Sequence, residues 1–351
     1  MKISQQEMTI NGNLKLGGNQ PVLFSGPCAV ESPEICLEIG TKIKTLSEKH
    51  GFGYVFKASF DKANRTSTES FRGIGFEKSL QVLEMVGQTL DVPLVTDIHE
   101  SYQVEAVAEV VDVLQIPAFL CRQTDLLIAA GKTGKAIKIK RGQFMAPEDM
   151  QYAVDKIRST GNNNVALTER GFSLGYHNLV VDMRALPIMR QFAPVVFDVT
   201  HSVQQPGANK GSSGGQRQMA PYLARAAAAA GVDGFFIETH PNPSVALSDG
   251  PNMVPLDKMD EFLAMLKDAW TRSFIPGWSE NQQLTCNALE LRHLIQNASF
   301  DGLLPEDYHL EGLNSFFEKY FSGIPLTPFE LAKVDFLLSD AFILYANHIF
   351  G

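Results

Sequence analysis

The sequence predicts a (β/α)8 barrel followed by a helical segment, and three observations lead to this prediction. Stretches suited to helices alternate with short strand-like runs. Those runs are almost continuously apolar, which is typical of parallel strands that are buried on both faces. They number eight within about 230 residues, as the barrel requires, at 21–26, 54–59, 93–98, 112–117, 136–140, 165–171, 195–200 and 234–240. A doubly wound parallel sheet is the alternative architecture.

The elements follow in order along the chain. Residues 8–18, "MTINGNLKLGG", alternate in polarity around Asn11-Gly12, which predicts a β-hairpin that closes the bottom of the barrel. After the first strand, Ser32 suits a helix N-cap, Pro33 suits the first turn, and Gly51 suits the end of the helix. A later alanine-rich stretch, "QMAPYLARAAAAAG", predicts a helix that stops at its final glycine.

The strand pattern stops after residues 272–283, "RSFIPGWSENQQ". We therefore expect a barrel domain over residues 1–275 and a helical appendage over residues 284–351. The spacing of four apolar residues in the appendage predicts a packing face rather than a ligand site: Leu331, Val334, Leu338 and Phe342. Oligomer contact, regulation and stabilisation all remain open as roles of this appendage.

Composition excludes several classes of protein. The chain has 351 residues, of which 44% are hydrophobic and 20% charged, and it contains no apolar run of membrane-spanning length. Its first residues lack the apolar core of a signal peptide, so we expect a cytoplasmic protein whose four cysteines stay reduced. The formal charge of −9 argues against nucleic acid or an anionic membrane as a partner. Any site for anions must therefore be local.

Positively charged side chains gather where the predicted strands end. In a (β/α)8 barrel the active site lies at this end of the strands and in the loops that follow them. A single lysine or arginine there is usually a solvated surface residue. Six together in an acidic protein predict a site for a multiply anionic, phosphorylated ligand: Lys57, Lys62, Arg65, Arg122, Lys140 and Arg170.

A second set at the same strand ends offers thiolate, imidazole and carboxylate donors, which suit a divalent metal ion. Its members are Cys28, His99, His201, Glu238, His240 and Asp249. These residues come from different strands, so spacing does not choose among the three histidines. A packed, hydrogen-bonded side chain is the commoner role of a lone cysteine or histidine, and a nucleophilic cysteine is another alternative.

The glycine-rich loop at residues 206–215, "PGANKGSSGG", suits either a lid over the site or a solvated connector. It lacks the pattern of a nucleotide-binding P-loop.

Motifs from all eight predicted units resemble those of the 3-deoxy-D-manno-octulosonate 8-phosphate synthase family, over about residues 20 to 270. They include "GPCAVES", "FKASFDKANRTS", "TDIHE", "LQIPAFLCRQTDL", "KRGQF", "FDVTHSVQQPG" and "FIETHPNP". The resemblance implies a (β/α)8 homotetramer. It also implies condensation of phosphoenolpyruvate with D-arabinose 5-phosphate and water, with release of phosphate, for lipopolysaccharide biosynthesis.

The resemblance also implies roles for individual residues. Phosphoenolpyruvate would be held by Lys57, Lys62, Lys140 and Arg170, with Gln115 and the backbone around Ala118 and Phe119. The sugar phosphate would meet Asn64, Arg65 and Thr66, and its hydroxyls would meet Asp97, while Arg122 would reach a neighbouring subunit's site. The catalytic residues would be Lys57, Lys62, Asn64, Asp97, Lys140 and His201.

A divalent metal ion is implied as the cofactor, since the metal-dependent members of this family carry a cysteine at the position of Cys28 and the metal-free members an asparagine. The implied ligands are Cys28, His201, Glu238 and Asp249, with Mn²⁺, Fe²⁺, Co²⁺ or Zn²⁺ as the ion. This assignment leaves His99 and His240 as neighbours of the metal site.

Two alternative functions compete with this interpretation. The related 3-deoxy-D-arabino-heptulosonate 7-phosphate synthases use erythrose 4-phosphate and typically carry "KPRTS" where this chain has "KANRTS", so Asn64 discriminates between the two. A non-catalytic barrel that uses its helical tail as a binding module is the alternative from another class of protein.

Overall fold

The computed structural model describes residues 6–12, 14–65, 67–209, 212–272, 278–280 and 283–350. The chain divides into two compact units, Met1–Trp270 and Thr271–Gly351. Thr66, expected to contact the sugar phosphate, lies outside the described residues.

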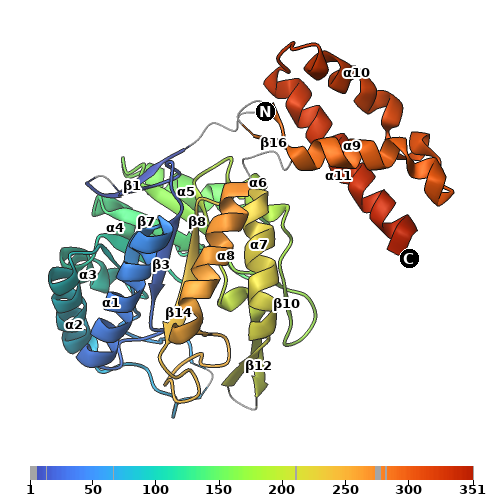
Figure 1. Cartoon of the computed structure of the whole chain (residues 1–351). Helices are drawn as coiled ribbons and strands as arrows, with labels where there is room; N and C mark the ends of the chain where they lie inside the picture. Colours follow the sequence, from blue (N-terminus) through green and yellow to red (C-terminus); the bar gives the residue numbers. More distant parts are fainter. Residues whose placement is uncertain are drawn as a thin grey trace. The chain divides into compact units, whose positions relative to one another are not determined.

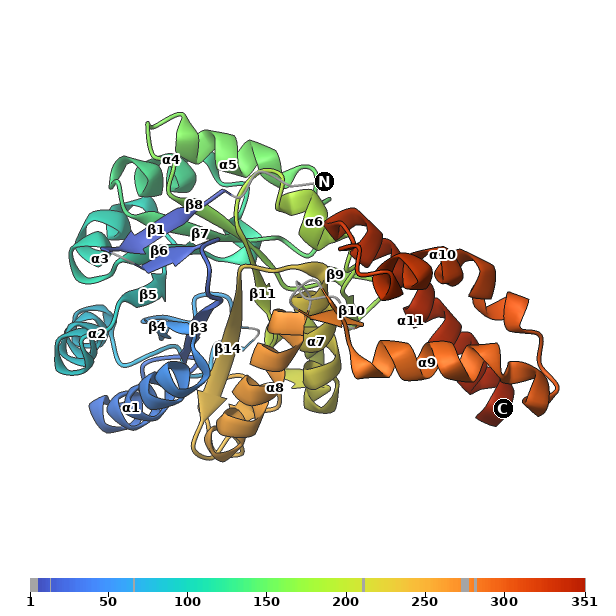
Figure 2. The ribbon, with the colours of Figure 1, turned by 45° about the horizontal axis from the view of Figure 1, so that its top comes forward.

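The first unit is a closed barrel of eight parallel strands, shown in Figures 1 and 2. In chain order the strands are β3 (Val22–Gly26), β4 (Gly53–Lys57), β5 (Leu94–Asp97), β6 (Val113–Ile116), β7 (Ala136–Lys140), β8 (Val165–Glu169), β11 (Val195–Asp198) and β14 (Gly234–His240). Each pairs with the next along the chain, and β14 pairs with both β11 and β3. This closure confirms the (β/α)8 barrel and rules out the doubly wound sheet.

The strands are almost continuously apolar because both of their faces are buried. Along β3, Val22 and Phe24 belong to a core cluster inside the barrel, whereas Leu23 belongs to the cluster shared with the surrounding helices. Alternate residues of a strand point to opposite faces, so an inward and an outward core both require apolar side chains.

Eight helices follow the eight strands and lie outside them (Figure 2). They are α1 (Pro33–His50), α2 (Phe76–Leu90), α3 (Val104–Val110), α4 (Thr124–Lys132), α5 (Met150–Arg158), α6 (Ala185–Met189), α7 (Ala220–Ala230) and α8 (Met259–Arg272). The predicted ends of α1 are confirmed: the Ser32 side chain accepts a hydrogen bond from the backbone N–H of Ile35, and Gly51 adopts the left-handed conformation with φ of 68°.

The predicted hairpin is also confirmed, as β1 (Met8–Asn11) and β2 (Leu14–Leu16). Met8, Ile10 and Leu16 are buried in the core cluster inside the barrel. The same cluster contains Val22, at the start of β3, so the hairpin covers the N-terminal ends of the strands. The opposite, C-terminal end is left for the functional site.

Short elements complete the two units. The strands are β9 (Phe172–Ser173), β10 (Leu179–Val180), β12 (Gln204–Asn209), β13 (Ser212–Gly215), β15 (Val254–Pro255), β16 (Ser279–Glu280) and β17 (Gln283–Leu284). The 3₁₀ turns are η1 (Ser101–Gln103), η2 (Ala118–Leu120), η3 (His201–Val203), η4 (Arg217–Met219), η5 (Leu256–Lys258), η6 (Ala298–Asp301) and η7 (Pro305–Tyr308). Residues 206–209 and 212–215 of the glycine-rich loop belong to the antiparallel ribbon β12–β13.

The second unit packs α9 (Cys286–Gln296), α10 (Leu310–Phe321) and α11 (Pro328–Phe350) around a small core of its own. Leu331, Val334 and Leu338 are buried there, as their spacing predicts. The prediction for Phe342 is wrong, because this side chain is 52% exposed. At 100° per residue Ala341 continues the buried face and Phe342 lies beside it. Among the described residues, no helix is long and apolar enough to span a membrane.

Candidate active site

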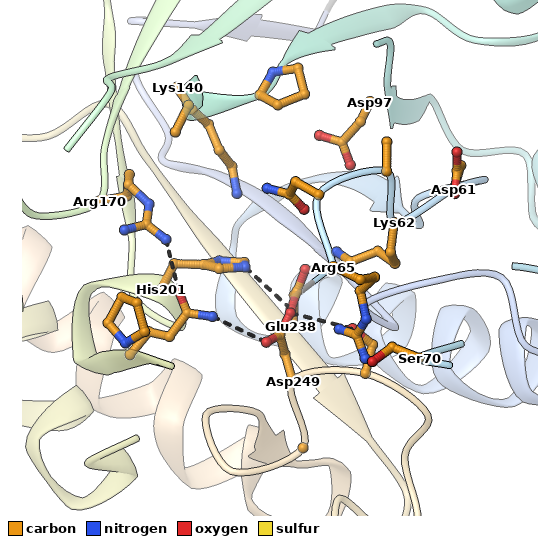
Figure 3. Close-up of a pocket in the computed structure, with 18 of the residues that line it drawn as sticks. Asp61, Lys62, Arg65, Ser70, Asp97, Lys140, Arg170, His201, Glu238 and Asp249 are labelled. Atoms are coloured by element: carbon orange, nitrogen blue, oxygen red, sulfur yellow. Dashed lines mark hydrogen bonds and ion pairs between the residues drawn. The ribbon is translucent and has the colours of Figure 1, made fainter. Parts of the chain in front are cut away.

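A cavity of about 900 Å³ opens at the C-terminal ends of the barrel strands (Figure 3). It brings together thirteen of the residues singled out in the sequence: Lys57, Lys62, Asn64, Arg65, Asp97, His99, Ala118, Phe119, Lys140, Arg170, His201, Glu238 and Asp249. Gln115 is buried beneath the cavity and reaches it through Asp97. Arg122 is exposed and does not line the cavity.

Three of the four expected metal ligands form a compact cluster in which Cys28 and Glu238 are buried and Asp249 is half-buried. One donor atom each from Cys28, Glu238 and Asp249 lies within 4.8 Å of the other two. Cys28 Sγ is 3.3 Å from Asp249 Oδ2, and Glu238 Oε2 is buried without a hydrogen-bond partner. An unpartnered buried carboxylate oxygen is costly unless a cation or donor meets it. The donor set and this oxygen therefore fit a borderline divalent metal ion.

The orientation of His201 distinguishes it from the other two candidate histidines. Its Nδ1 lies 3.0 Å from Asp198 Oδ1, which leaves Nε2 facing the cluster at 3.8 Å from Glu238 Oε2. His240 instead accepts the backbone N–H of Asn242 at Nδ1, and the ring of His99 packs edge-on against Phe60. Only His201 of the three thus presents a ring nitrogen to Glu238, and the carboxylate on its other nitrogen fixes the ring.

Burial and neighbouring charges set the ionisation of this cluster. Burial, reinforced by the negative charge of Glu238, raises the pKa of the Cys28 thiol to about 12. Burial also opposes ionisation of Glu238, but Lys57, His201 and Lys62 hold its pKa at about 2. Without a bound cation Cys28 is therefore a neutral thiol beside ionised carboxylates, which argues against a nucleophilic thiolate, whereas a coordinated divalent ion would deprotonate it.

The cations of the site are held by neighbouring side chains. Lys57 Nζ contacts Glu238 Oε1 at 2.6 Å, and Lys140 Nζ contacts Asp198 Oδ2 at 2.8 Å. Arg170 donates from Nη2 to Gln204, while its buried Nη1 has no hydrogen-bond partner. The side chains of Lys140 and Arg170 both point toward the interior of the cavity (Figure 3). An unpartnered guanidinium nitrogen beside a lysine suits a phosphate or carboxylate group.

A hydrogen-bonded chain beneath the cavity holds Asp97. Lys138 Nζ donates to Gln115 Oε1 at 2.6 Å, the Gln115 amide donates to Asp97 Oδ1, and the Ser59 hydroxyl donates to Asp97 Oδ2. Sequence reasoning missed Lys138. The available signal was its spacing from Lys140, because two lysines two residues apart in an apolar strand point to the same face.

A buried ion pair was also missed. Arg141 donates from Nε and Nη2 to the two carboxylate oxygens of Glu169, each at 2.6 Å, and both side chains are buried. Arg141 directly follows Lys140, and Glu169 directly precedes Arg170. The pair therefore ties together the ends of the two strands that carry these cavity cations. Asp198 and Arg217, which contacts the Gly250 carbonyl beside the cavity, were also not singled out.

The fold and this site define a (β/α)8-barrel enzyme that acts on multiply anionic ligands beside a cluster of metal-ligand type. The model of the DAHP synthetase I family matches residues 1–273, so the chain belongs to that family. Residues 260–351 match a second model, described as a scaffold domain.

Three relatives within this family carry the name 2-dehydro-3-deoxyphosphooctonate aldolase, a synonym of the synthase that the motifs resemble. The protein from Cyanothece sp. is 55% identical over 74% of this chain and 96% of its own length. That from Geobacter sulfurreducens is 52% identical over 75% and 97%, and that from Brucella abortus 56% identical over 73% and 93%. The predicted synthase family is thereby confirmed, and the erythrose 4-phosphate alternative is not favoured.

Proposed function

We propose that this chain condenses phosphoenolpyruvate with D-arabinose 5-phosphate and water to give 3-deoxy-D-manno-octulosonate 8-phosphate and inorganic phosphate. The enol carbon C3 of phosphoenolpyruvate forms a bond to the aldehyde carbon of the sugar. The oxygen of a water molecule adds to C2, the C2–O bond to phosphate breaks, and the water-derived hydroxyl becomes the new ketone after losing its proton. The aldehyde oxygen takes up a proton and becomes a hydroxyl.

The observation that carries this proposal is the convergence of cations from separate strands on one cavity. Lys140 and Arg170 lie together on one side, and the unpartnered Nη1 of Arg170 is available to an oxyanion. Arg65 lies apart from this pair (Figure 3) and donates to the Ser248 hydroxyl at 2.8 Å, and Asn64 lines the same cavity. Two phosphorylated substrates require two such anion-binding regions, and the released phosphate is stabilised by the same cations.

Asp97 is the proposed acceptor for the sugar hydroxyls. Ser59 and Gln115 both donate to its carboxylate, so its position is fixed before substrate binds. Lys57, Lys62 and Lys140 hold the pKa of Asp97 far below its usual range despite burial. Asp97 is therefore an ionised acceptor throughout the physiological pH range.

We further propose that Cys28, His201, Glu238 and Asp249 hold a divalent metal ion. The support is the compact cluster, the unpartnered Glu238 Oε2 and the orientation of His201 by Asp198. Such an ion would supply polarisation of the sugar aldehyde or positioning of the water. The candidates are Mn²⁺, Fe²⁺, Co²⁺ and Zn²⁺, which suit a mixed thiolate, imidazole and carboxylate set.

The metal proposal is tested by elemental analysis of purified protein after dialysis against each ion. The wild-type chain should retain about one ion per chain, and Cys28→Ser should retain far less, because a hydroxyl is a poor substitute for thiolate. Cys36→Ser is the matched control, since Cys36 is an equally buried thiol on α1 outside the cluster. Equal metal content in Cys28→Ser and wild type would overturn the proposal.

The choice of aldose is tested by phosphate release with arabinose 5-phosphate and erythrose 4-phosphate. Asn64→Ala should lower kcat/KM for arabinose 5-phosphate by about 5- to 150-fold, the equivalent of about 1–3 kcal/mol for a lost hydrogen bond. Asn163→Ala is the control, since Asn163 is exposed and precedes β8 at the opposite end of the barrel. Equal or better turnover of erythrose 4-phosphate by the wild type would overturn the assignment.

We also propose that the enzyme works in the cytoplasm as a homotetramer in which Arg122 reaches a neighbouring subunit's site. In support, Arg122 is exposed outside its own cavity. Sedimentation equilibrium tests the tetramer. Arg122→Ala should raise KM without changing the sedimentation coefficient, because a side chain that only binds substrate is not needed for assembly.

A further inference from the structure

The helical unit exposes an unusual share of large apolar side chains. Nine of the nineteen exposed large hydrophobic residues among those described lie within Thr271–Gly351, which is less than a quarter of the chain. Three of them lie at seven-residue spacing on α11: Phe329, Phe336 and Ile343, which are 80%, 72% and 58% exposed. Seven residues are two helical turns, so these side chains form one stripe along the helix.

This stripe lies opposite the face that α11 buries in its own unit. An α-helix turns about 100° about its axis per residue, so the side chains of Phe329 and Ile343 point within about 20° of the direction of Phe336. The buried Val334 and Leu338 point within about 20° of the opposite direction. A surface helix of a globular protein usually carries one apolar face. A second one indicates that α11 has another partner.

The residues beside the stripe are small on one flank and charged on the other. Ala332 and Ser339 follow Phe329 and Phe336 by three residues, so large and small positions alternate along the seam. The Ser339 hydroxyl accepts a hydrogen bond from the Trp278 indole N–H at 2.9 Å, so the Trp278 ring borders this flank. Lys333 and Asp340 follow the same two phenylalanines by four residues, on the other flank. In each of two successive heptads, α11 thus presents a large apolar side chain, a small side chain and a charged side chain.

This pattern complements itself when two copies of α11 run antiparallel. A two-fold axis between residues 337 and 338 places Phe336 opposite the partner's Ser339, and Phe329 opposite the partner's Ala346. Each large side chain then faces a small one, with the Trp278 ring beside the contact at Ser339.

The charges complement one another under the same axis. Lys333 comes within two residues, about 3 Å along the helix, of the partner's Asp340, and symmetry makes this pair twice. A parallel pair would instead place Phe336 against Phe336 and Lys333 against Lys333. This complementarity of size and charge favours one partner for the stripe, namely α11 of a second copy of this chain in antiparallel orientation.

We infer that the C-terminal unit is a homodimerisation element in which α11 pairs antiparallel with α11 of a second chain through Phe329, Phe336 and Ile343. This contact is separate from the catalytic cavity, because every residue on which it depends lies after residue 328. It does not depend on the reaction that the barrel performs.

Cysteine cross-linking of the full chain tests both the contact and its orientation. In a Cys286→Ser background, which removes the one exposed native thiol among the described residues, Phe336→Cys should give a covalent dimer under mild oxidation. Phe329→Cys alone should not, because two copies of residue 329 lie about 26 Å apart along an antiparallel pair. Co-expressed Phe329→Cys and Ala346→Cys chains should cross-link to each other.

The control and the contrary outcomes are equally specific. Phe300→Cys, at a position 88% exposed in the same unit but off α11, should remain uncross-linked. A covalent dimer through Phe329→Cys alone would mean a parallel pair and would overturn the orientation. No cross-linking at residue 336 would mean that the stripe is covered otherwise, by the barrel of the same chain or by another protein, and would overturn the inference.

Charge reversal is a second, independent test of the inferred contact. Lys333→Asp and Asp340→Lys chains should each associate about tenfold more weakly through the tail than wild type, because each places like charges opposite one another twice. Co-expression of the two should restore association, since every facing pair is then opposite in sign. Because Asp340 also contacts His309 at 2.6 Å, far-UV circular dichroism must show that both variants remain folded. Unchanged association of both variants would contradict the inference.

Discussion

The buried pair of Arg141 and Glu169 gives the sharpest test of how the barrel holds its cavity. Replacing Arg141 by methionine removes both 2.6 Å hydrogen bonds to Glu169 and a third to the Met145 carbonyl. Glu169 then keeps only the backbone N–H of Gly171 at 2.6 Å. Breaking one side of such a buried pair leaves an uncompensated charge, which costs about 3–5 kcal/mol.

Equilibrium unfolding in urea, followed by far-UV circular dichroism, measures this loss. The double variant Arg141→Met with Glu169→Leu should recover most of the stability, because apolar residues of similar volume leave no charge unpaired. Arg184→Met is the matched control: Arg184 pairs with Asp182 in solvent, so its loss should leave the unfolding midpoint unchanged within error.

The same variants separate stability from activity. Because Arg141 and Glu169 adjoin Lys140 and Arg170, the double variant should stay folded yet show a raised KM for phosphoenolpyruvate. A loss below about 1 kcal/mol in Arg141→Met, or a double variant no more stable than the single one, would refute the reasoning, since a buried pair should not behave like an exposed one.

Three further predictions concern the metal cluster and the helical unit. Cys28→Asn should bind little metal yet keep some activity in the presence of a chelator, because the amide can hydrogen-bond where the ion would sit; full loss of activity would contradict this. The Lys319 ammonium and the N–H and hydroxyl of Thr327 lower the pKa of Glu330 from its ordinary value of 4.5 to about 2. Ionised Glu330 should therefore stabilise the helical unit at pH values above 4.5, and this stabilisation should disappear as the pH falls toward 2. The difference in Tm between wild type and Glu330→Gln should therefore shrink between pH 5 and pH 2, and a difference that grows would refute the sign. A chain ending at Glu280 should remain folded and turn over substrate, since all proposed catalytic residues precede residue 250; an insoluble or inactive product would show that the helices complete the barrel.

Local patterns in the sequence determined the barrel itself. Each strand is recognisable because burial on both faces demands apolar residues throughout, as Val22, Leu23 and Phe24 show. The Asn11-Gly12 turn and the Ser32 cap were equally readable, because hairpin turns and helix ends depend on residues a few positions apart. The cations at strand ends followed from the topology, which brings the carboxyl ends of parallel strands to one face.

The residues of the second unit show where prediction from local sequence patterns fails. Spacing along α11 located its buried face but put Phe342 there as well, because a one-residue step changes the direction of a side chain by 100°. The exposed stripe through Phe336 escaped notice for the same reason, since a sequence shows two apolar faces of a helix without showing which one its neighbours cover.

Only the tertiary structure decided which side chains of the site contact one another. Residue spacing did not choose among three histidines, and only the family resemblance implied His201; in the structure Asp198 turns its Nε2 toward Glu238. Lys57 and Glu238 are 181 residues apart, yet their side chains meet at 2.6 Å inside the closed barrel. Such contacts depend on the register and closure of eight strands, whereas propensity and periodicity act over a few residues, so the sequence determined which groups reach the strand ends and the tertiary fold determined their partners.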